Sequence, residues 1–444
     1  MMFRLLTALL VATAPAPGAD GLGDPYFPLA GNGGYDVAHY DLAVTYDPVT
    51  STLTGTTGIT ATASQDLSRF DLDFAGPPVG HVTVNGQPAS YDRNGHKLVI
   101  TPARNLAGGS RFFVRVAYRG RPGPSTDPSL GATGWLGTAS GAVTLSEPIG
   151  SESWFPVNDH PSDKATYDFR VTVPRGLRVL ANGEEAGRSP GGAGLVTYHW
   201  SEQTPMASYL AMIAIGRFRV RSGRTPGGIP ETTAVPATGA YDLDALYQET
   251  SAAIDWESKV FGPYPFRSTG GIVTDAAVGY SLETQGRPVY GWMPSQDIVV
   301  HELAHQWFGD SVSLVSWRDI WLNEGFATYA EWLWDEQHGG PSAQSRFDAA
   351  YQGPANWQIA PADPGRDRMF DLFAVYQRGA MTLQALRSAV GDTAFFAILR
   401  DWTAQYRNAG ATTADFVTLA ERVSGRDLRS LFQSWLQGTS KPPA

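Results

Sequence analysis

The feature that most constrains the fold of this 444-residue chain is a change in the period of its apolar residues near residue 222. From about Gly34 to Val220, apolar side chains recur at every second position, as half-buried antiparallel strands require. Clear examples are the runs from Tyr40 to Tyr46 and from Phe112 to Tyr118, and Asn85-Gly86 is a dipeptide that suits a tight hairpin turn. We therefore predict a β-sheet domain over residues 20–221.

Beyond residue 222 the apolar residues follow the spacing of helices. A loop containing Thr225-Pro226-Gly227-Gly228 comes first, and a helical face over residues 243–254 ends before Gly262-Pro263. After a short β-like stretch near Ile272 and Val273, further helices are predicted over residues 295–308, 322–337, 375–390, 393–404, 413–423 and 428–436. The sequence therefore predicts a second, mainly helical domain over residues 222–444, and a chain of this length fits two domains.

The composition excludes some classes of function. The chain carries 33 Lys and Arg against 43 Asp and Glu, a formal net charge of -10, and no basic cluster. Because nucleic-acid binding needs a concentrated basic surface, we expect no nucleic-acid partner. The chain has no cysteine, so a metal ion would have to be held by histidines and carboxylates.

The first nineteen residues have the layout of an export signal. Arg4 precedes an apolar run from Leu5 to Ala12, and small residues and prolines follow to Ala19, after which we expect cleavage. The apolar run is too short for a permanent bilayer-spanning helix, and no later stretch is long and apolar enough. We therefore expect a secreted, extracellular protein without a membrane anchor. A disordered N-terminus without a targeting role is the alternative.

The motif that points most directly to chemistry is His301-Glu302-Leu303-Ala304-His305. On a helix, residues four apart lie on one face, so both imidazoles can reach a single zinc ion. Glu302 then lies beside the metal, where it can accept a proton from the attacking water and return it to the leaving amine. The alternative is a surface helix with two solvated histidines.

A catalytic zinc ion takes three protein ligands and leaves a fourth position for water or substrate. Glu324 can supply the third ligand, because it lies at the start of the next predicted helix, after eighteen intervening residues. The extended metzincin motif requires Gly and His where Phe308 and Ser311 stand, which excludes that class. We therefore predict one zinc ion per chain, bound by His301, His305 and Glu324.

Longer stretches around these residues resemble one family. The runs from His301 to Asp310 and from Trp317 to Ala327 are similar to the aminopeptidase N and leukotriene hydrolase family of zinc metallopeptidases, which are gluzincins. Leu282-Glu283-Thr284 resembles the family's Gly-x-Met-Glu-Asn segment, and Tyr376-Gln377-Arg378-Gly379 resembles its Tyr-x-Lys-Gly segment. The region that starts at Glu147 resembles the part of the β domain that lends a second amine-binding residue.

The resemblance implies a fold and a set of roles. The expected fold is an N-terminal antiparallel β-sandwich domain followed by a thermolysin-like, mainly helical zinc peptidase domain. Glu283 and Glu147 would bind the α-ammonium of a peptide substrate with a free N-terminus, and Tyr376 would donate a hydrogen bond to the oxyanion. The implied function is a zinc metalloaminopeptidase, a hydrolase that removes N-terminal residues from peptides.

The chain departs from the family's pattern in two respects. Tyr280 stands where the amine-binding segment begins with Gly, and Leu282 and Thr284 replace the usual Met and Asn. We expect the protein to lack the family's long C-terminal helical domain, which roofs the active site, and therefore to have a more open site. Two alternatives therefore stay open: a zinc endopeptidase with an open active site, and a non-catalytic β-sandwich binding protein with a vestigial metal site.

Overall fold

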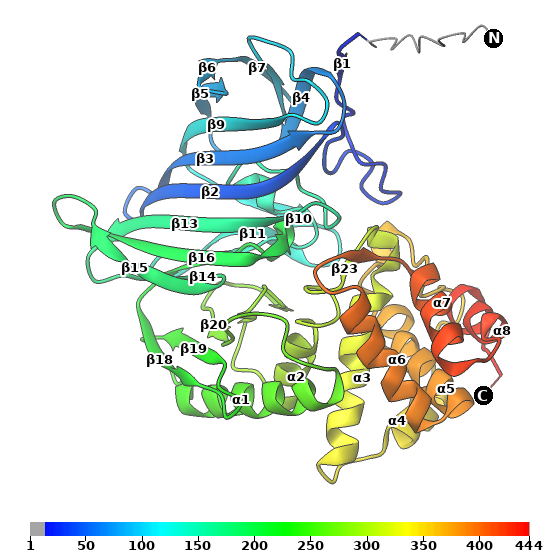
Figure 1. Cartoon of the computed structure of the whole chain (residues 1–444). Helices are drawn as coiled ribbons and strands as arrows, with labels where there is room; N and C mark the ends of the chain where they lie inside the picture. Colours follow the sequence, from blue (N-terminus) through cyan, green and yellow to red (C-terminus); the bar gives the residue numbers. More distant parts are fainter. Residues whose placement is uncertain (1–13, 444) are drawn as a thin grey trace, which may run out of the picture.

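The computed structural model describes residues 14–443, which form a β-rich part followed by a mainly helical part. Figure 1 shows the strands of the first part stacked above the helices of the second, with the chain crossing between them near β18 (Phe218–Arg224). The predicted order of a β domain and a helical domain is confirmed. Residues 1–13 of the predicted signal peptide lie outside the described residues.

The largest sheet of the first domain has eight strands, and its alternating burial follows the period-two pattern of the sequence. Along β2, for example, Tyr40, Leu42, Val44 and Tyr46 are each at most 4% exposed. In spatial order the strands are β15 (Glu184–Pro190), β16 (Leu195–Ala207), β13 (Lys164–Pro174), β2 (Tyr35–Asp47), β3 (Thr52–Ala63), β9 (Arg111–Gly120), β5 (Val79–Val84) and β6 (Gln87–Pro88). Asn85 and Gly86 adopt φ angles of 51° and 76° between β5 and β6, as the hairpin prediction requires.

Two smaller sheets complete the first domain. One contains β1 (Ala16–Pro17), β4 (Leu67–Asp73), β8 (Lys97–Thr101) and β7 (Ser90–Asn94). The other contains β10 (Pro124–Asp127), β11 (Gly131–Gly137), β12 (Ala142–Leu145), β17 (Ile213–Gly216) and β14 (Arg178–Ala181). The predicted antiparallel β-sandwich is confirmed as the fold class. Two strand pairs within it run parallel, β13 with β2 and β1 with β4. Parallel pairing needs a long connection between the two strands, and many residues separate β2 from β13 and β1 from β4.

The second domain begins with a small sheet of β18, β19 (Pro230–Pro236), β20 (Ile272–Val273), β22 (Val289–Tyr290) and β21 (Ser281–Leu282). The change of sheet falls between β17 and β18, a few residues before the predicted boundary at residue 222. β17 and β18 therefore belong to different sheets, although only one residue separates them in the chain. A further pair, β23 (Ser313–Leu314) and β24 (Gly410–Ala411), lies among the helices.

The helices of the second domain follow the predicted segments closely. They are α1 (Leu243–Val260), α2 (Gln296–Ala304), α3 (Trp321–Gln337), α4 (Ala343–Gln352), α5 (Arg378–Val390), α6 (Asp392–Gln405), α7 (Thr413–Ser424) and α8 (Arg429–Phe432). A π-helical segment, Leu372–Gln377, leads into α5. α4 was not predicted, although the Ser342 side chain caps it by accepting a hydrogen bond from the Ser345 amide. None of the helices within residues 14–443 combines the length and the apolar character needed to cross a bilayer.

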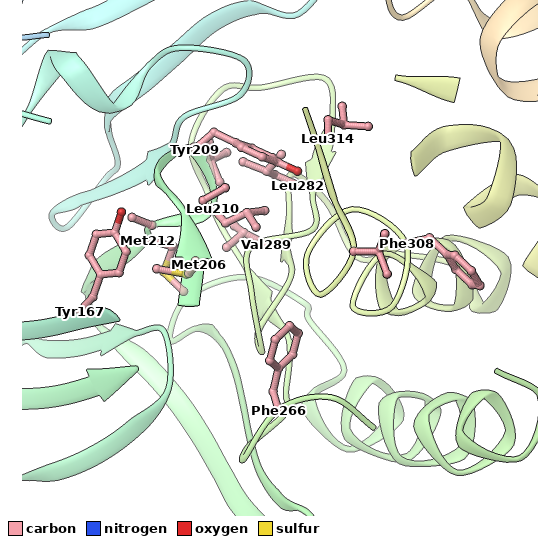
Figure 2. Close-up of a cluster of buried hydrophobic side chains, with 14 of the residues drawn as sticks. Tyr167, Met206, Tyr209, Leu210, Met212, Phe266, Leu282, Val289, Phe308 and Leu314 are labelled. Atoms are coloured by element: carbon pink, nitrogen blue, oxygen red, sulfur yellow. The ribbon is translucent and has the colours of Figure 1, made fainter. Parts of the chain in front are cut away.

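A continuous apolar core joins the two domains. Figure 2 shows Met206, Tyr209 and Leu210, which lie just before β17, packed beside Leu282, Val289 and Leu314 of the second domain. Arg287 adds a buried polar clamp: its Nε donates to the Thr232 carbonyl at 3.1 Å, and its Nη2 donates to the Gly183 carbonyl at 3.3 Å. Thr232 lies in β19 of the second domain and Gly183 lies in the first domain. Arg287 therefore holds the two domains in a fixed position relative to each other.

Candidate functional site

α2 places both motif histidines on one face, as the four-residue spacing predicts. From Val299 to Ala304 every residue of the helix is buried, and Val299, Val300 and Leu303 are fully shielded from solvent. The His301 and His305 rings lie with their centroids 4.9 Å apart and their planes at 76°. His301 and His305 are only 8% and 2% exposed, and this burial excludes the alternative of two solvated histidines.

The Nδ1 atom of each histidine ring is already bonded, which fixes where its Nε2 atom points. His301 Nδ1 lies 2.6 Å from a Glu331 carboxylate oxygen, and His305 Nδ1 lies 3.0 Å from the Phe308 carbonyl oxygen. Such partners orient the ring and settle the tautomer of a metal-binding histidine. The Nε2 atoms therefore remain for a metal ion.

Glu324, near the start of α3, faces these two Nε2 atoms. Its Oε2 lies 3.2 Å from His301 Nε2 and 3.5 Å from His305 Nε2. Ligands at zinc distances of about 2.0–2.2 Å in a tetrahedron are about 3.3 Å apart, so the three atoms fit a zinc ion. Burial alone would raise the pKa of Glu324, but the neighbouring rings of His305 and His301 lower it to about 2.

Glu302 lies in the same site and is 7% exposed. Burial raises the pKa of its carboxyl to about 8, although the two imidazoles act in the opposite direction. A general base works best when its pKa is close to the operating pH, so this environment suits a group that takes up a proton and passes it on.

Tyr376 reaches the site because α3 and the start of α5 approach each other closely. A Cβ atom added to Gly325 of α3 would lie 2.8 Å from the Gly379 Cα, so a larger residue would force the two helices apart. The Tyr376 ring lies nearly parallel to the His301 ring, at 13° and a centroid distance of 5.9 Å. Burial raises the pKa of Tyr376 well above its usual value, so the hydroxyl keeps its proton and can donate it in a hydrogen bond.

Glu283 and Glu147 come from different domains and are both buried. Glu283 Oε1 accepts a hydrogen bond from the Tyr209 hydroxyl at 3.2 Å, whereas Glu147 Oε1 has no partner among the described residues. Burial raises the pKa of both carboxyls, and the acidic groups around them add to the effect. Buried carboxylates without a cation are unfavourable, so this part of the site favours a positively charged ligand.

All seven residues that the sequence singled out line one cavity of about 370 Å³. They are His301, Glu302, His305, Glu324, Tyr376, Glu283 and Glu147. The structure therefore brings together every predicted site residue, including two that are 136 positions apart in the chain. The roles of the individual residues stay predictions.

Sequence reasoning missed the residues that hold this site in position. The partner of a ligand histidine is not Asp319, whose carboxylate accepts a hydrogen bond from the Thr413 hydroxyl at 2.6 Å. Glu331 is the actual partner, and its position seven residues after Glu324, two turns along the same helix face, could have indicated it. Gln306 was also missed: its Nε2 donates to the Glu283 carbonyl at 3.0 Å and its Oε1 accepts from the Gly286 amide at 2.6 Å.

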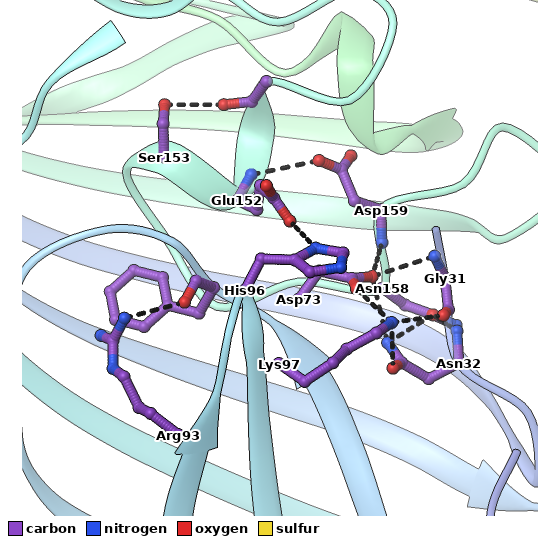
Figure 3. Close-up of polar contacts among 12 residues, drawn as sticks. Gly31, Asn32, Asp73, Arg93, His96, Lys97, Glu152, Ser153, Asn158 and Asp159 are labelled. Carbon is purple, nitrogen blue, oxygen red and sulfur yellow. Dashed lines mark hydrogen bonds and ion pairs between the residues drawn. The ribbon is translucent and has the colours of Figure 1, made fainter. Parts of the chain in front are cut away.

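A second group with metal-ligand spacing lies in the β domain. Asp73, His96 and Glu152 each offer a ligand atom within 4.8 Å of the others. Figure 3 shows, however, that Lys97 points into this group, with its Nζ 2.5 Å from Asp73 Oδ1. The His96 Nδ1 atom is bonded to Glu152 at 2.7 Å. The ammonium of Lys97 already supplies the positive charge, so this group serves as an internal polar network.

Comparison with known proteins identifies the family. The Peptidase M1 N-terminal domain matches residues 37–210, and the Peptidase family M1 domain matches residues 293–435. The crystal structure of an M1 zinc metallopeptidase from Deinococcus radiodurans is 33% identical, with a TM-score of 0.88 over 95% of this chain and 98% of that one.

Two curated relatives are much longer than this chain. Aminopeptidase M1-C of Oryza sativa subsp. japonica is 28% identical over 69% of this chain and 38% of its own length. Aminopeptidase N of Lactobacillus helveticus is 25% identical over 91% of this chain and 51% of its own length. The predicted family resemblance and the predicted zinc cofactor are thereby confirmed. Since both domains match and a solved structure is covered almost completely, the chain belongs to the M1 family of zinc metallopeptidases.

Proposed function

We propose that this protein is a zinc-dependent aminopeptidase that removes single residues from the free N-terminus of peptides. The observation that carries the proposal is the placement of two buried carboxylates, Glu147 and Glu283, in the cavity that holds the three metal ligands. Relatives named aminopeptidases support it, although the chain spans only 38–51% of the length of the two described above. A mutant of the Deinococcus radiodurans enzyme has been solved with the substrate Tyr-Ser-Ala bound, which also supports a peptide substrate.

His301, His305 and Glu324 would hold the zinc ion in this proposal. When bound, zinc polarises the scissile carbonyl and lowers the pKa of water from about 16 toward about 7. Glu302 takes the proton from the attacking water and returns it to the leaving amine. General acid–base catalysis of this kind typically accelerates a reaction by about 10²–10⁴-fold. The Tyr376 hydroxyl donates a hydrogen bond to the developing oxyanion, and one such donor contributes about 2.7–4 kcal/mol.

Glu147 and Glu283 account for the restriction to free N-termini. An α-ammonium group placed between them neutralises buried carboxylates that otherwise lack a cation, so its binding is favoured. An acetylated N-terminus or an internal peptide bond offers no charge there and leaves these groups unpaired, which disfavours it by a large factor. The Tyr209 hydroxyl and Gln306 hold Glu283 at the position that this contact needs.

We also propose that the protein is exported. The layout of residues 1–19, with Arg4, an apolar run and a small-residue end at Ala19, supports this. Expression in a secreting bacterial host, followed by N-terminal sequencing of the protein in the medium or periplasm, tests it. Cleavage after Ala19 or nearby is expected, and retention of an uncleaved chain in the cytoplasm would contradict the proposal.

The activity is tested with a panel of aminoacyl-coumarins that covers small, bulky, acidic and basic residues, each also in N-acetylated form. Cleavage of unblocked substrates only, abolished by 1,10-phenanthroline and by Glu302→Gln, is expected. Glu184→Gln is the matched control, because Glu184 is exposed on β15 outside the active-site cavity. Equal cleavage of acetylated substrates would favour an endopeptidase. No cleavage by a protein with full zinc content would favour a non-catalytic binding protein.

A further inference from the structure

Five of the lining residues of the active-site cavity that have no role in the proposed reaction are apolar or aromatic, beside the uncharged polar residues Ser281, Thr328 and Gln377. The five are Leu130, Tyr280, Trp292, Ile298 and Leu372, and we call these five residues the apolar collar. Trp292 is 42% and Leu372 is 73% exposed, although large apolar side chains are usually buried. Exposed apolar residues gathered at a cavity mark a surface that binds something.

The β-domain side of the apolar collar is held in a defined position. Leu130 lies in the turn between β10 and β11, where the Asp127 carboxylate accepts hydrogen bonds from the amides of Ser129 at 2.8 Å and Leu130 at 3.0 Å. The Tyr280 hydroxyl donates to the Ala132 carbonyl of β11 at 2.8 Å. Tyr280, which stands where related segments have glycine, therefore connects the hairpin of one domain to the segment that carries Glu283.

The catalytic-domain side is held equally well. Leu372 begins the π-helical segment, and the Asp371 carboxylate caps it by accepting from the amides of Phe373 at 3.2 Å and Ala374 at 2.9 Å. Leu372 lies about one helical turn before Tyr376, so both side chains face the same cavity. A group that contacts Leu372 is therefore close to the substrate carbonyl on which Tyr376 would act.

Apart from the two predicted ligand histidines, the acidic and basic residues that line the cavity are all glutamates. Glu147, Glu283, Glu302, Glu324 and Glu331 line it, and none of its lining residues among those described is Lys or Arg. A negatively charged side chain in this cavity would find no cation of the protein to pair with and would be repelled by the carboxylates. An apolar side chain meets neither penalty.

We propose that the cavity selects peptides whose first residue has a bulky, uncharged side chain, such as Phe, Tyr, Leu or Met, and that the apolar collar is the surface that selects it. This inference rests on the proposed aminopeptidase function. With the ammonium at Glu147 and Glu283 and the carbonyl at the metal ligands, the first side chain is the substrate group left to occupy the apolar collar. Acidic first residues are the poorest substrates.

The test compares the full-length protein on Phe-, Leu-, Ala- and Glu-coumarin at equal zinc content. We expect kcat/KM for Phe to exceed that for Ala by about 10–200-fold, the discrimination that a difference of even one methylene gives in an apolar pocket. The variants Leu372→Ala and Trp292→Ala should lower the Phe-to-Ala ratio. Val49→Ala should not, because Val49 is 91% exposed in the turn between β2 and β3, outside the cavity.

Introducing a positive charge at the apolar collar makes the test sharper. Leu372→Arg should raise the rate on Glu relative to Phe by about three- to fivefold, because it supplies the missing cation in a partly exposed position. Cleavage of unblocked substrates with Ala or Glu preferred, or a Phe-to-Ala ratio that the collar variants leave at the value of Val49→Ala, would overturn this inference and leave the aminopeptidase function standing. Absence of cleavage of every unblocked substrate would instead remove the proposed function itself.

Discussion

Among the described residues, groups of imidazole and carboxylate side chains with the spacing of metal ligands occur in both domains. His301, His305 and Glu324 form the group in the helical domain. Asp73, His96 and Glu152 form the group in the β domain. In both, the ligand atoms lie within 4.8 Å of one another, so spacing alone does not distinguish a metal site from a structural network.

The difference between the two groups lies in which atoms are already bonded. Asp73 Oδ2 accepts three hydrogen bonds, from the Gly31 amide, the Asn32 side chain and the Asp159 amide, while its Oδ1 faces the Lys97 ammonium. In the helical domain the Nδ1 atoms are bonded and the Nε2 atoms converge on Glu324 without any Lys or Arg nearby. A metal site needs donor atoms that converge on one point and lack a cation of the protein, and only the group in the helical domain meets both conditions.

The largest expected difference concerns zinc itself. His305→Ala should reduce the zinc content from one ion per chain toward zero and lower turnover by about 10³-fold or more, because polarisation by the metal is worth several kcal/mol. His96→Ala should leave both at the wild-type level. Metal analysis by mass spectrometry with parallel turnover assays checks this, and loss of zinc in the His96 variant would break the comparison.

The second prediction concerns the positive charge inside the β domain. Lys97→Met should lower the free energy of unfolding by about 3–5 kcal/mol, because it leaves the buried Asp73 carboxylate without its ion pair. The double variant Lys97→Met/Asp73→Asn should lose less, since no unpaired charge remains. Urea unfolding measures both. An unchanged midpoint for the single variant would mean that the lysine is not the internal cation of this network.

A smaller effect is expected from the carboxylate that orients His301. Glu331→Gln should weaken zinc binding by about 10–100-fold, the usual effect of losing such a partner. Competition with a chromogenic chelator measures the affinity. Glu152→Gln is the matched control, because Glu152 contacts His96 in the same way in the other group. Equal affinity in both variants would show that the Glu331 contact does not support the metal site.

The smallest effect is a pH dependence of stability. The hydrogen bond to Glu152 raises the pKa of His96 above 6.5, so the protonated form is favoured in the folded protein. Its contribution to stability is therefore fully present below about pH 6.5 and is lost as the pH rises through the higher folded value. Because His96 is partly exposed, we expect less than about 1 kcal/mol. Thermal unfolding of His96→Asn and wild type should differ more at about pH 6.5 than at about pH 9; equal differences would contradict the pairing.

Much of the site was predictable because its residues occur at short, regular intervals in the sequence. The four-residue interval between His301 and His305 places both rings on one helix face wherever α2 lies, and the third ligand heads the next helix. The second-domain helices were predicted for the same reason, since apolar period and end residues are local properties. α4 was overlooked, although the turn residues before it and Ser342 were visible in the sequence.

Other parts could not be predicted from spacing. Glu147 and Glu283 line one cavity although they come from different domains, which Arg287 and the apolar core hold together. Family resemblance alone predicted that they would share a site. The apolar collar likewise combines a turn of the β domain with residues of the helical domain. No motif or spacing around Lys97 predicted that its ammonium would pair with the buried Asp73 carboxylate in the β domain.

The sequence by itself determined the order of the domains and the grouping of the three predicted zinc ligands with Glu302, because the apolar period and the spacing of these residues are local properties of the chain. Only the tertiary structure decided which ligand-like group has free donor atoms, which carboxylates share the substrate cavity and which side chains surround its entrance. Those properties depend on contacts between segments more than a hundred residues apart, and no local interval encodes where such segments meet.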